Sequence, residues 1–350
     1  MSWCAWSWGP WGWGKYQATY LHGALVFNRT NLEPSGILIP GFVDLHIHGG
    51  FGIDFMSAGS ADMVRLADRL EEEGYDFFLP TTVTAPLEDV RSALDNLPAH
   101  SMMPGFHLEG PFISRLHPGA QPMESIQDFD SMGDGWEEVL DDPRLKLITL
   151  APEKQDAGSC IRRLASRGPI VGMGHTDATF AQAESGFEHG VRHATHVFNA
   201  MRPFHHREAG AVGYALLQDH MSCEIIYDRH HVSRNAAELL FRSKPKDKVV
   251  AVSDATMAAG MPEGAAFTMW GHEVVTSGGT VRLKESGALA GSAITLLDAF
   301  RNLAEDFDVE TAAGACSINP RRVLGVDPLK SKQWVLFDEG LNIKELLPIR

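Results

Sequence analysis

Short apolar runs alternate with segments of helical periodicity along most of this chain, and this alternation constrains the fold more than any other feature. Between the first two runs, residues 61–73 carry apolar side chains at helical spacing, with Ser60 as a cap and Gly74 as a stop. Repeated strand–helix units predict parallel strands joined by right-handed crossovers. Strands are expected at Gly41–His48, Phe77–Val83, Gly105–Gly110, Leu145–Glu153, Ile170–Thr176, Ala194–Asn199, Cys223–His231 and Lys248–Ala255.

These units predict an α/β protein with a closed (β/α)8 barrel of the TIM type over residues 41–324. The alternative is an open doubly wound sheet, which typically has a GxGxxG loop after its first strand. That loop is absent from the sequence, so the barrel is favoured. Residues 264–284 alternate like a β-hairpin with a Ser-Gly-Gly turn, and we expect this hairpin to interrupt the step from the eighth strand to its helix.

Strand-like pieces at both ends of the chain fall outside the barrel pattern. They are Ala18–Phe27, Gly36–Ile39 and Gln333–Phe337. Residues 1–40 and 325–350 are therefore expected to pair into a small β-domain that closes the chain on itself. Its N-terminal part is short and rich in Trp, and we interpret the first thirteen residues as an atypical or poorly ordered leader rather than as an aromatic contact patch.

Charge and cysteine usage limit the classes of partner. The net charge of −15 over 350 residues argues against a nucleic-acid backbone or an anionic membrane surface as the main partner. One local cationic site would still accommodate a small anion. No stretch reaches the roughly 18 apolar residues that span a bilayer, and no secretory signal pattern is present. The four cysteines form no CxxC pair, so we expect a cytoplasmic protein.

Histidines and one glutamate fall at the carboxyl ends of the expected strands, where barrel enzymes place their active sites. His46 and His48 are two residues apart, so their side chains point to the same side of the first strand. Glu109 precedes a Gly-Pro break at the end of the third strand, and His175 ends the fifth. On the sixth strand we take His196 as the ligand candidate, whereas His193, three residues earlier, is interpreted as structural.

Asp254 ends the eighth strand after four apolar residues and is aimed into the same mouth. Independent accidents would not gather His, Glu and Asp side chains from five strands at one rim, so we interpret them as a metal centre. A divalent cation held in this way activates water and polarises a carbonyl. Asp254 would accept the proton of the attacking water and pass it to a leaving nitrogen. The sequence therefore predicts a metal-dependent amide hydrolase.

Cationic residues follow the sixth and seventh strands. They are Arg202, His205, His206 and Arg207 in the first case, and Arg229, His230 and His231 in the second. Beside the expected metal centre of an acidic protein, such donors suggest an anionic substrate group such as phosphate. A solvated basic loop explains the same composition equally well.

Eight motifs in order resemble one known family. They are PGFVDLHIHGG, HLEGPF, GHTDAT, HATHVFNAM, REAG, DRHHV, VSDAT and ALAGSA, and the resemblance runs from Pro40 to about Gly325. Through them the chain resembles the amidohydrolase superfamily and, within it, the N-acetylglucosamine-6-phosphate deacetylases. This resemblance implies a (β/α)8 barrel with a small β-domain built from both chain ends, usually in a homodimer.

The resemblance also implies roles for single residues. Glu109, His175 and His196 would be the main metal ligands, His46 and His48 would allow a second ion, and Asp254 would be the catalytic acid and base. Zn²⁺ is the expected metal, one or two ions per subunit, with Fe²⁺, Mn²⁺ and Co²⁺ as alternatives. Asn199, Ala200, Arg207 and His231 would hold the sugar phosphate, with one group donated across the dimer. Ala120, Leu289, Ala290 and Gly291 would line the sugar and acetyl pocket.

The implied reaction is deacetylation of N-acetylglucosamine 6-phosphate to glucosamine 6-phosphate and acetate, in amino-sugar catabolism or cell-wall recycling. The alternatives are N-acetylgalactosamine 6-phosphate, another N-acyl or cyclic amide substrate, and a sugar-phosphate sensor without activity. The sequence departs from the family pattern at three places. Gln121 stands where the family commonly has His, the N-terminal segment is rich in Trp, and residues 331–336 lack the usual C-terminal pattern.

Overall fold

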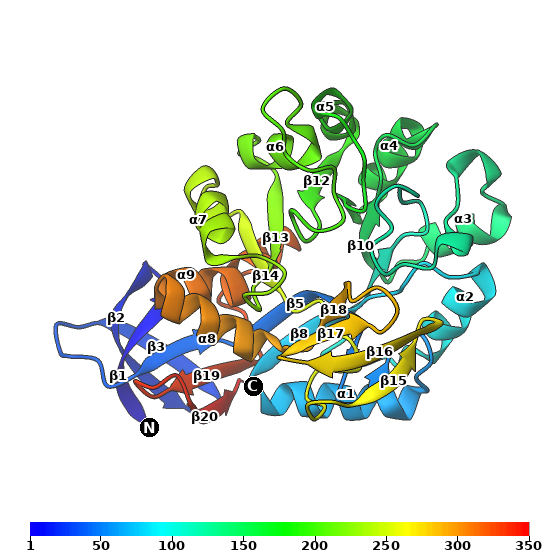
Figure 1. Cartoon of the computed structure of the whole chain (residues 1–350). Coiled ribbons are helices and arrows are strands. Elements are labelled where there is room, and N and C mark those ends of the chain that lie inside the picture. The colour runs from blue at the N-terminus through cyan, green and yellow to red at the C-terminus, as the bar shows by residue number, and fades with distance from the viewer. Residues whose placement is uncertain (350) are drawn as a thin grey trace.

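The computed structural model describes residues 1–349, which form a parallel barrel flanked by one antiparallel sheet and one mixed sheet (Figure 1). A six-stranded parallel sheet, β9 to β14, and the parallel pair β5–β8 supply the barrel strands. Bridges between Thr81 and His107 and between Ile47 and Ala255 join the two pieces into a ring. The barrel strands are β5 (Phe42–Ile47), β8 (Tyr75–Pro80), β9 (Phe106–Glu109), β10 (Leu145–Leu150), β11 (Ile170–Met173), β12 (Val191–Ala194), β13 (Ser222–Ile226) and β14 (Val249–Val252).

Helices cover the outside of the barrel, and the predicted fold class is confirmed. In α1, Met63, Leu66 and Leu70 are buried in the main core, as their helical spacing predicts. Ser60 is the first residue of that helix rather than its cap, and its hydroxyl donates to the Asn96 carbonyl at 2.7 Å. The helices are α1 (Ser60–Glu72), α2 (Leu87–Asn96), α3 (Asp134–Leu140), α4 (Ala157–Arg167), α5 (Phe180–His189), α6 (Gly210–Leu217), α7 (Arg234–Ser243), α8 (Leu296–Asp306), α9 (Val309–Ala313) and α10 (Asn319–Val323).

Short elements complete the barrel. They are β6 (Gly49–Gly50), β7 (Ile53–Asp54), the 3₁₀ turns Met123–Ser125 and Phe129–Ser131, and the π-helical turn Gly314–Ile318.

The sixth barrel strand ends earlier than the apolar pattern predicts. It spans Val191–Ala194 rather than Ala194–Asn199, and residues 195–200 turn away from the strand direction. This segment resembles a strand in the sequence because it carries apolar residues. Val197 is fully buried, although it belongs to a turn. Several expected strands lose their last residues in the same way, so His175, His196 and Asp254 lie just beyond the strands, whereas His46 and Glu109 are strand residues.

The insertion after β14 is larger than the predicted hairpin at 264–284. Four antiparallel strands form a sheet in the order β15–β16–β17–β18, and the last of them returns to the barrel. Residues 254–256 of the eighth-strand loop pair with Ser292 of β18: the Ser292 N–H donates to the Asp254 carbonyl at 2.8 Å, and the Thr256 N–H donates to the Ser292 carbonyl at 3.1 Å. The strands are β15 (Ala266–Met269), β16 (His272–Ser277), β17 (Thr280–Leu283) and β18 (Leu289–Ser292).

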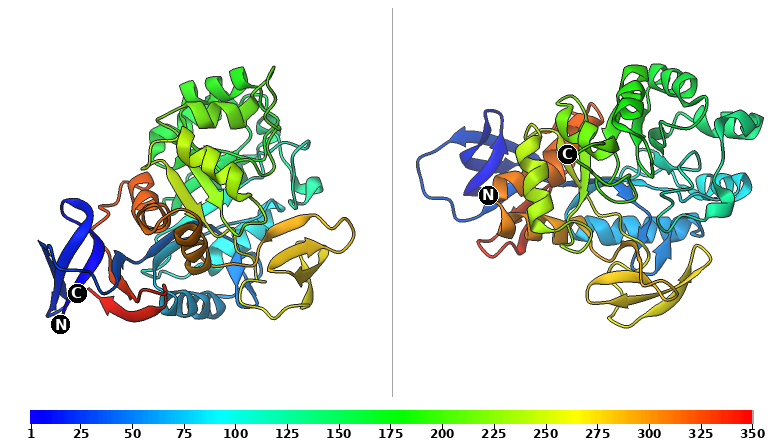
Figure 2. Two further views of the ribbon diagram at one scale, coloured as in Figure 1. Left: turned by 60° about the vertical axis from the view of Figure 1, so that its left-hand side comes forward. Right: turned by 45° about the horizontal axis from the view of Figure 1, so that its top comes forward.

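Both chain ends build a six-stranded sheet in the order β20–β19–β4–β1–β2–β3, on the side of the barrel away from the insertion (Figure 2). The interpretation of the first thirteen residues as a poorly ordered leader was wrong. They belong to a hairpin in which Trp8 pairs with Trp13, and the rings of Trp6 and Trp13 stack with centroids 6.2 Å apart. Aromatic side chains favour the pleated surface of a strand. The strands are β1 (Ser2–Gly9), β2 (Gly12–Leu21), β3 (Ala24–Arg29), β4 (Ile37–Pro40), β19 (Gln333–Phe337) and β20 (Ile343–Pro348).

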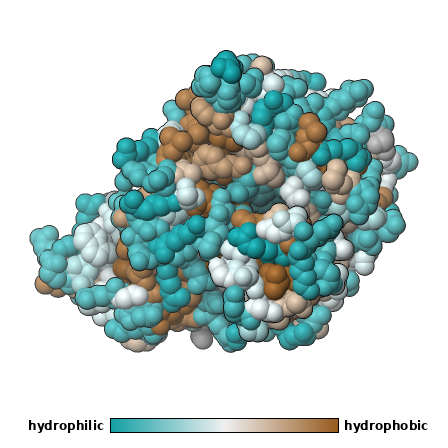
Figure 3. All heavy atoms as spheres, in the orientation of Figure 1, coloured by the Kyte–Doolittle hydropathy of each residue, from teal (hydrophilic) through white to brown (hydrophobic). Residues whose placement is uncertain are grey.

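Polar side chains dominate the molecular face drawn in Figure 3, and apolar atoms form smaller patches between them. The sequence supplies 45 acidic and 30 basic residues for this surface. Among the described residues, no helix combines the length and the apolarity that crossing a bilayer requires.

A buried ion pair joins the barrel to the terminal sheet. Arg321 of α10 is fully buried, and it donates to the Asp76 carboxylate at 2.5 Å and to the Gly41 carbonyl at 2.8 Å. It also donates to the Ser331 hydroxyl at 3.0 Å, just before β19 begins. These bonds fix the junctions of both chain ends with the barrel.

Arg321→Met should therefore lower the free energy of unfolding by about 3–5 kcal/mol, because it leaves Asp76 buried without its cation. Urea denaturation followed by circular dichroism would measure the change. Arg242→Met is the matched control, since Arg242 forms an exposed pair with Glu238 on α7. Its loss should cost less than about 1 kcal/mol. Equal effects of the two variants would contradict a structural role for the buried pair.

Candidate active site

A pocket opens at the carboxyl ends of the barrel strands. It encloses about 610 Å³ of empty space, part of it open to solvent. Its lining combines imidazoles, carboxylates, two amides and a few apolar side chains. The lining residues are His48, Glu109, Gly119, Ala120, Gln121, His175, His196, Asn199, Ala200, Ile226, His231, Asp254, Trp270, Leu289 and Gly291.

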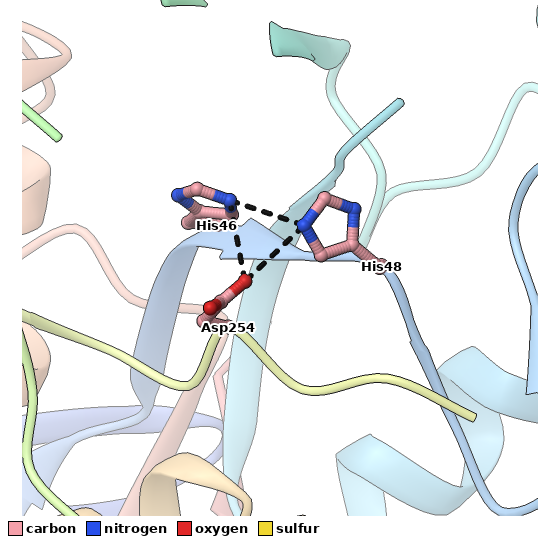
Figure 4. Close-up of side chains that lie close together, drawn as sticks. All are labelled: His46, His48 and Asp254. Carbon is pink, nitrogen blue, oxygen red and sulfur yellow. Dashed lines mark hydrogen bonds and ion pairs between the residues drawn. The ribbon is translucent and has the colours of Figure 1, made fainter. Parts of the chain in front are cut away.

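Two histidines at the end of β5 face Asp254 (Figure 4). The Nε2 atoms of His46 and His48 lie 3.2 Å apart, so the two rings meet on one side as their spacing predicts. Asp254 Oδ1 lies 3.4 Å from Nε2 of His46 and 3.2 Å from Nε2 of His48. All three side chains are largely buried.

Glu109 connects this group to the other two predicted ligands. Its Oε1 lies 3.1 Å from Nε2 of His175, 3.0 Å from Nε2 of His196 and 3.4 Å from Nε2 of His46. Its Oε2 lies 3.4 Å from Nε2 of His48. The structure thus gathers the four predicted histidine ligands around the fifth ligand, the buried carboxylate of Glu109.

The outer nitrogen of three of these rings faces an atom that only accepts hydrogen bonds. Nδ1 of His48 lies 3.1 Å from the Thr81 carbonyl, and Nδ1 of His175 lies 3.0 Å from the His117 carbonyl. Nδ1 of His46 lies 3.1 Å from a carboxylate oxygen. These partners require the proton on Nδ1, so in the neutral ring Nε2 presents a bare lone pair to the pocket.

The inner nitrogens therefore face one another and the carboxylates without a donor between them. Such an arrangement of lone pairs is repulsive unless a proton or a cation lies among them. Imidazole nitrogens and carboxylate oxygens are the ligands of Zn²⁺ and similar divalent ions. Two triads, His46–His48–Asp254 and His46–Glu109–His196, each have ligand atoms within 4.8 Å of one another. The donor set fits a divalent cation.

The electrostatics of the cluster agree with this fit. Burial alone would raise the pKa of Glu109, but the neighbouring imidazoles of His46 and His175 hold that pKa well below its usual range. Burial likewise opposes ionisation of Asp254, and His46 and His48 lower its pKa. Burial disfavours a charged His46, yet Glu109 and Asp254 raise its pKa well above the usual value. The same negative potential that draws a proton onto His46 attracts a cation.

Three of the candidate metal-binding and catalytic residues have left-handed backbone conformations. The φ angle is 46° at His175, 32° at His196 and 48° at Asp254, each just beyond a barrel strand. Such a conformation costs a non-glycine residue about 1–3 kcal/mol and is characteristic of functional sites. Gly119 has a φ of 58°, and a Cβ there would lie 3.2 Å from Cε1 of His175. Glycine at this position lets the loop approach the cluster closely.

Most of the residues predicted for substrate binding line the pocket, but two do not. Ala290 is fully buried in the core of the insertion, because its neighbours Leu289 and Gly291 occupy the opposite face of β18. Arg207 is exposed, and its Nη1 lies 2.9 Å from Nε2 of His206. Neither residue lines the pocket of its own chain.

Of the predicted basic cluster, only His231 reaches the pocket. Its side chain is 6% exposed, and its Nδ1 lies 2.6 Å from Asp228 Oδ2. Burial opposes protonation, but the bond to Asp228 raises the pKa of His231. Arg229 instead turns to Asp306 at 2.7 Å, and Arg202 pairs with Asp177 at 2.5 Å.

Sequence reasoning missed several residues of the site. Glu224 contacts His46 on the side away from the pocket, at 3.1 Å. The sequence signal for this residue is a carboxylate within an apolar strand. His107 lies two residues before Glu109, so the strand period could have placed it inside the barrel. Trp270 packs edge-on against His48 with ring centroids 5.1 Å apart, and nothing in its local sequence indicates this.

Gln121, the departure from the family motif, contacts Glu109 directly. Its Nε2 donates to Glu109 Oε2 at 2.6 Å, while its Oε1 accepts the Thr84 N–H at 2.7 Å. The amide nitrogen donates in the first bond and the amide oxygen accepts in the second, so the two bonds fix the orientation of the amide. Gln121 thus supports the central carboxylate as well as lining the pocket.

Comparison with known proteins agrees with this geometry. Residues 37–331 match the model of the amidohydrolase family. The chain is 35% identical to the N-acetylgalactosamine-6-phosphate deacetylase of Escherichia coli O157:H7, covering 89% of this chain and 86% of that protein. It is 36% identical to the N-acetylglucosamine-6-phosphate deacetylase of Bacillus subtilis (strain 168), covering 88% and 80%.

Solved structures show the same likeness over the whole chain. The N-acetylglucosamine-6-phosphate deacetylase of Thermotoga maritima superposes with a TM-score of 0.88 at 30% identity, covering 99% of this chain and 98% of that one. A variant of the Mycobacterium smegmatis enzyme, in complex with N-acetyl-D-glucosamine-6-phosphate, gives a TM-score of 0.87 at 25% identity, covering 95% and 93%. The chain belongs to the amidohydrolase family, in the branch that contains these deacetylases.

Proposed function

We propose that the protein hydrolyses the acetamide of N-acetylglucosamine 6-phosphate, giving glucosamine 6-phosphate and acetate, in amino-sugar catabolism or cell-wall recycling. The observation that carries this proposal is the buried cluster around Glu109, with Asp254 beside it at the pocket wall. The names of the B. subtilis and T. maritima relatives support the substrate. A divalent cation, Zn²⁺ in the first instance, would polarise the amide carbonyl and acidify water when bound by Glu109, His175 and His196. His46 and His48 allow for a second ion.

Asp254 has the position and the charge of a general base and acid. It lines the pocket, and its lowered pKa keeps it ionised at neutral pH. It would accept the proton of the attacking water and then protonate the leaving nitrogen as the C–N bond breaks. Amide hydrolysis needs this second transfer, because an amide anion is too basic to leave at neutral pH.

The sugar phosphate would contact the rim formed by Asn199, Ala200 and His231, and the acetyl group would lie towards Ala120, Leu289 and Gly291. All six residues line the pocket. No Lys or Arg is among the described residues of that lining, so His231 is the cationic donor that the chain itself offers.

His231→Asn should raise the KM for phosphorylated sugars about 10- to 100-fold, the value of one or two charge-assisted hydrogen bonds. The raised pKa of His231 sets the pH dependence. Phosphate binding should be complete below that pKa and weaken as pH rises through it, so KM should increase with pH above the ordinary pKa of histidine, where phosphate is largely a dianion. The variant should show a flat KM over that range. Unphosphorylated N-acetylglucosamine is the control, and an equal effect on both sugars would contradict the role.

Arg207 would serve a second subunit. It is exposed and lies outside the pocket lining of its own chain, and the family resemblance implies a homodimer with one phosphate donor crossing the interface. Arg207→Ala should then raise the KM for phosphorylated sugars without changing the metal content. We place the enzyme in the cytoplasm, which the four free cysteines support.

Acetate release from the glucosamine and galactosamine substrates, with and without phosphate, tests the proposal directly. The E. coli O157:H7 relative makes N-acetylgalactosamine 6-phosphate the second candidate. Metal analysis of the same samples would link turnover to bound ions. Absence of acetate from every substrate in the presence of Zn²⁺ or Fe²⁺ would refute the deacetylase proposal, and preference for the galactosamine epimer would replace it with the second candidate.

A further inference from the structure

A second buried carboxylate lies behind the metal-binding cluster. Glu224 is fully buried in β13, between apolar neighbours that are also buried. Its Oε2 lies 3.1 Å from Nδ1 of His46 and accepts the backbone N–H of His196 at 3.0 Å. Its Oε1 lies 2.8 Å from Nε2 of His193. Three donors thus converge on one side chain.

Glu224 has no place in the proposed reaction, because it does not line the pocket. A buried carboxylate is costly unless donors compensate it. Burial would raise the pKa of Glu224, but His193 and His46 hold that pKa well below its usual range. The donors that compensate this buried carboxylate are two imidazoles and one peptide group.

Its contacts tie together two ligands from strands that are not neighbours. His46 ends β5 and His196 follows β12, whereas Glu224 belongs to β13. On the pocket side, Glu109 Oε1 lies 3.4 Å from His46 Nε2 and 3.0 Å from His196 Nε2. Both ligands therefore lie between two carboxylates, with Glu224 behind and Glu109 in front.

We propose that Glu224 is a positioning residue that orients two metal ligands at once. It holds the proton of His46 on Nδ1, so that Nε2 turns a lone pair to the pocket, and it anchors the strained turn that carries His196. The inference rests on the proposal that the cluster binds a divalent cation. Carboxylates and other groups behind a metal-bound histidine typically change metal affinity about 10- to 100-fold.

Glu224→Gln tests the inference because it keeps the size of the side chain and removes its charge. The amide oxygen can still accept from His46 and His196. The amide nitrogen would face His193, which can change tautomer because its Nδ1 lies 2.6 Å from the Ser222 hydroxyl. Chelator-treated protein would be titrated with Co²⁺, and visible absorption and chelator competition would report coordination and affinity. We expect Co²⁺ affinity to fall about 10- to 100-fold, with little change in the melting temperature of the metal-free protein.

Ser222→Ala is the matched control, because it removes the other partner of His193 without touching a ligand. It should leave Co²⁺ affinity unchanged. Glu224→Asp is a second variant, which keeps the charge but is too short to reach both ligands, and it should also bind Co²⁺ more weakly. Wild-type affinity in Glu224→Gln and Glu224→Asp, or equal losses in Ser222→Ala, would overturn the role of Glu224. Failure of the wild-type protein to bind Co²⁺ would instead refute the metal proposal.

Discussion

Asp254→Asn is expected to lower kcat by about 10²- to 10⁴-fold, the usual contribution of a positioned acid–base group. Asparagine has nearly the same shape but can neither accept the proton of water nor protonate the leaving nitrogen. Asp254 follows β14, and its backbone is held on one side by the His46 carbonyl at 2.9 Å and on the other by β18. The substitution should therefore leave the fold and the metal content unchanged. Acetate release and metal analysis on one preparation would measure both quantities.

The pH profile gives an independent check on this role. The wild-type kcat/KM should fall at low pH as Asp254 is protonated, and that acidic limb should disappear in Asp254→Asn. Turnover close to that of the wild type would remove Asp254 from the mechanism. A variant that also lost its metal would show that Asp254 acts as a ligand, as its distances to His46 and His48 also allow.

Glu109→Gln is expected to abolish stable metal binding and, with it, turnover. The carboxylate faces four imidazoles within 3.4 Å, and it is the only acidic residue in the triad that it forms with His46 and His196. Removing one partner from a buried charged group costs about 3–5 kcal/mol, which corresponds to a loss of metal affinity of at least about 100-fold. Isothermal titration with Zn²⁺ and metal analysis after dialysis would measure this loss.

Glu273→Gln is the control for this prediction, because Glu273 lies on the exposed face of the insertion and pairs with Lys284. It should keep full metal content and activity. Gln121→Ala should give an intermediate result, since it removes one donor to Glu109 but no ligand. Retention of metal by Glu109→Gln would show that the histidines alone hold the ion.

The barrel and most of its rim could be predicted from the sequence because both follow from local periodicity. Strand runs alternate with helices, and a side chain at a strand end points to a known face of a barrel. These two rules are enough to place His46, Glu109, His175 and His196 at one rim. The placement of His196 is right although its strand was misplaced, because the turn after β12 carries that ring to the same rim.

The remaining features depend on contacts that no local pattern encodes. Trp270 reaches His48 only because the insertion folds back over the barrel. The role of Glu224 depends on its partners on β5 and beyond β12, which are distant from it in the sequence. Ala290 was assigned to the pocket because all residues of its motif were expected to line it. In a strand, however, only every second side chain points to the same face. The Trp-rich N-terminus was interpreted from its composition alone, although its pairing with β2 and β4 makes it part of the terminal sheet.

The return of β18 to the barrel has a consequence for the divergence of this family. Because Ser292 pairs with the backbone of Asp254 and of Thr256, the insertion is not structurally independent of the proposed acid and base. A chimera that replaced residues 264–292 would alter the pocket walls formed by Trp270, Leu289 and Gly291 and would also move the backbone of the proposed acid and base. New substrate preferences in this lineage should therefore arise through point changes on the pocket face of the insertion rather than through replacement of the whole module.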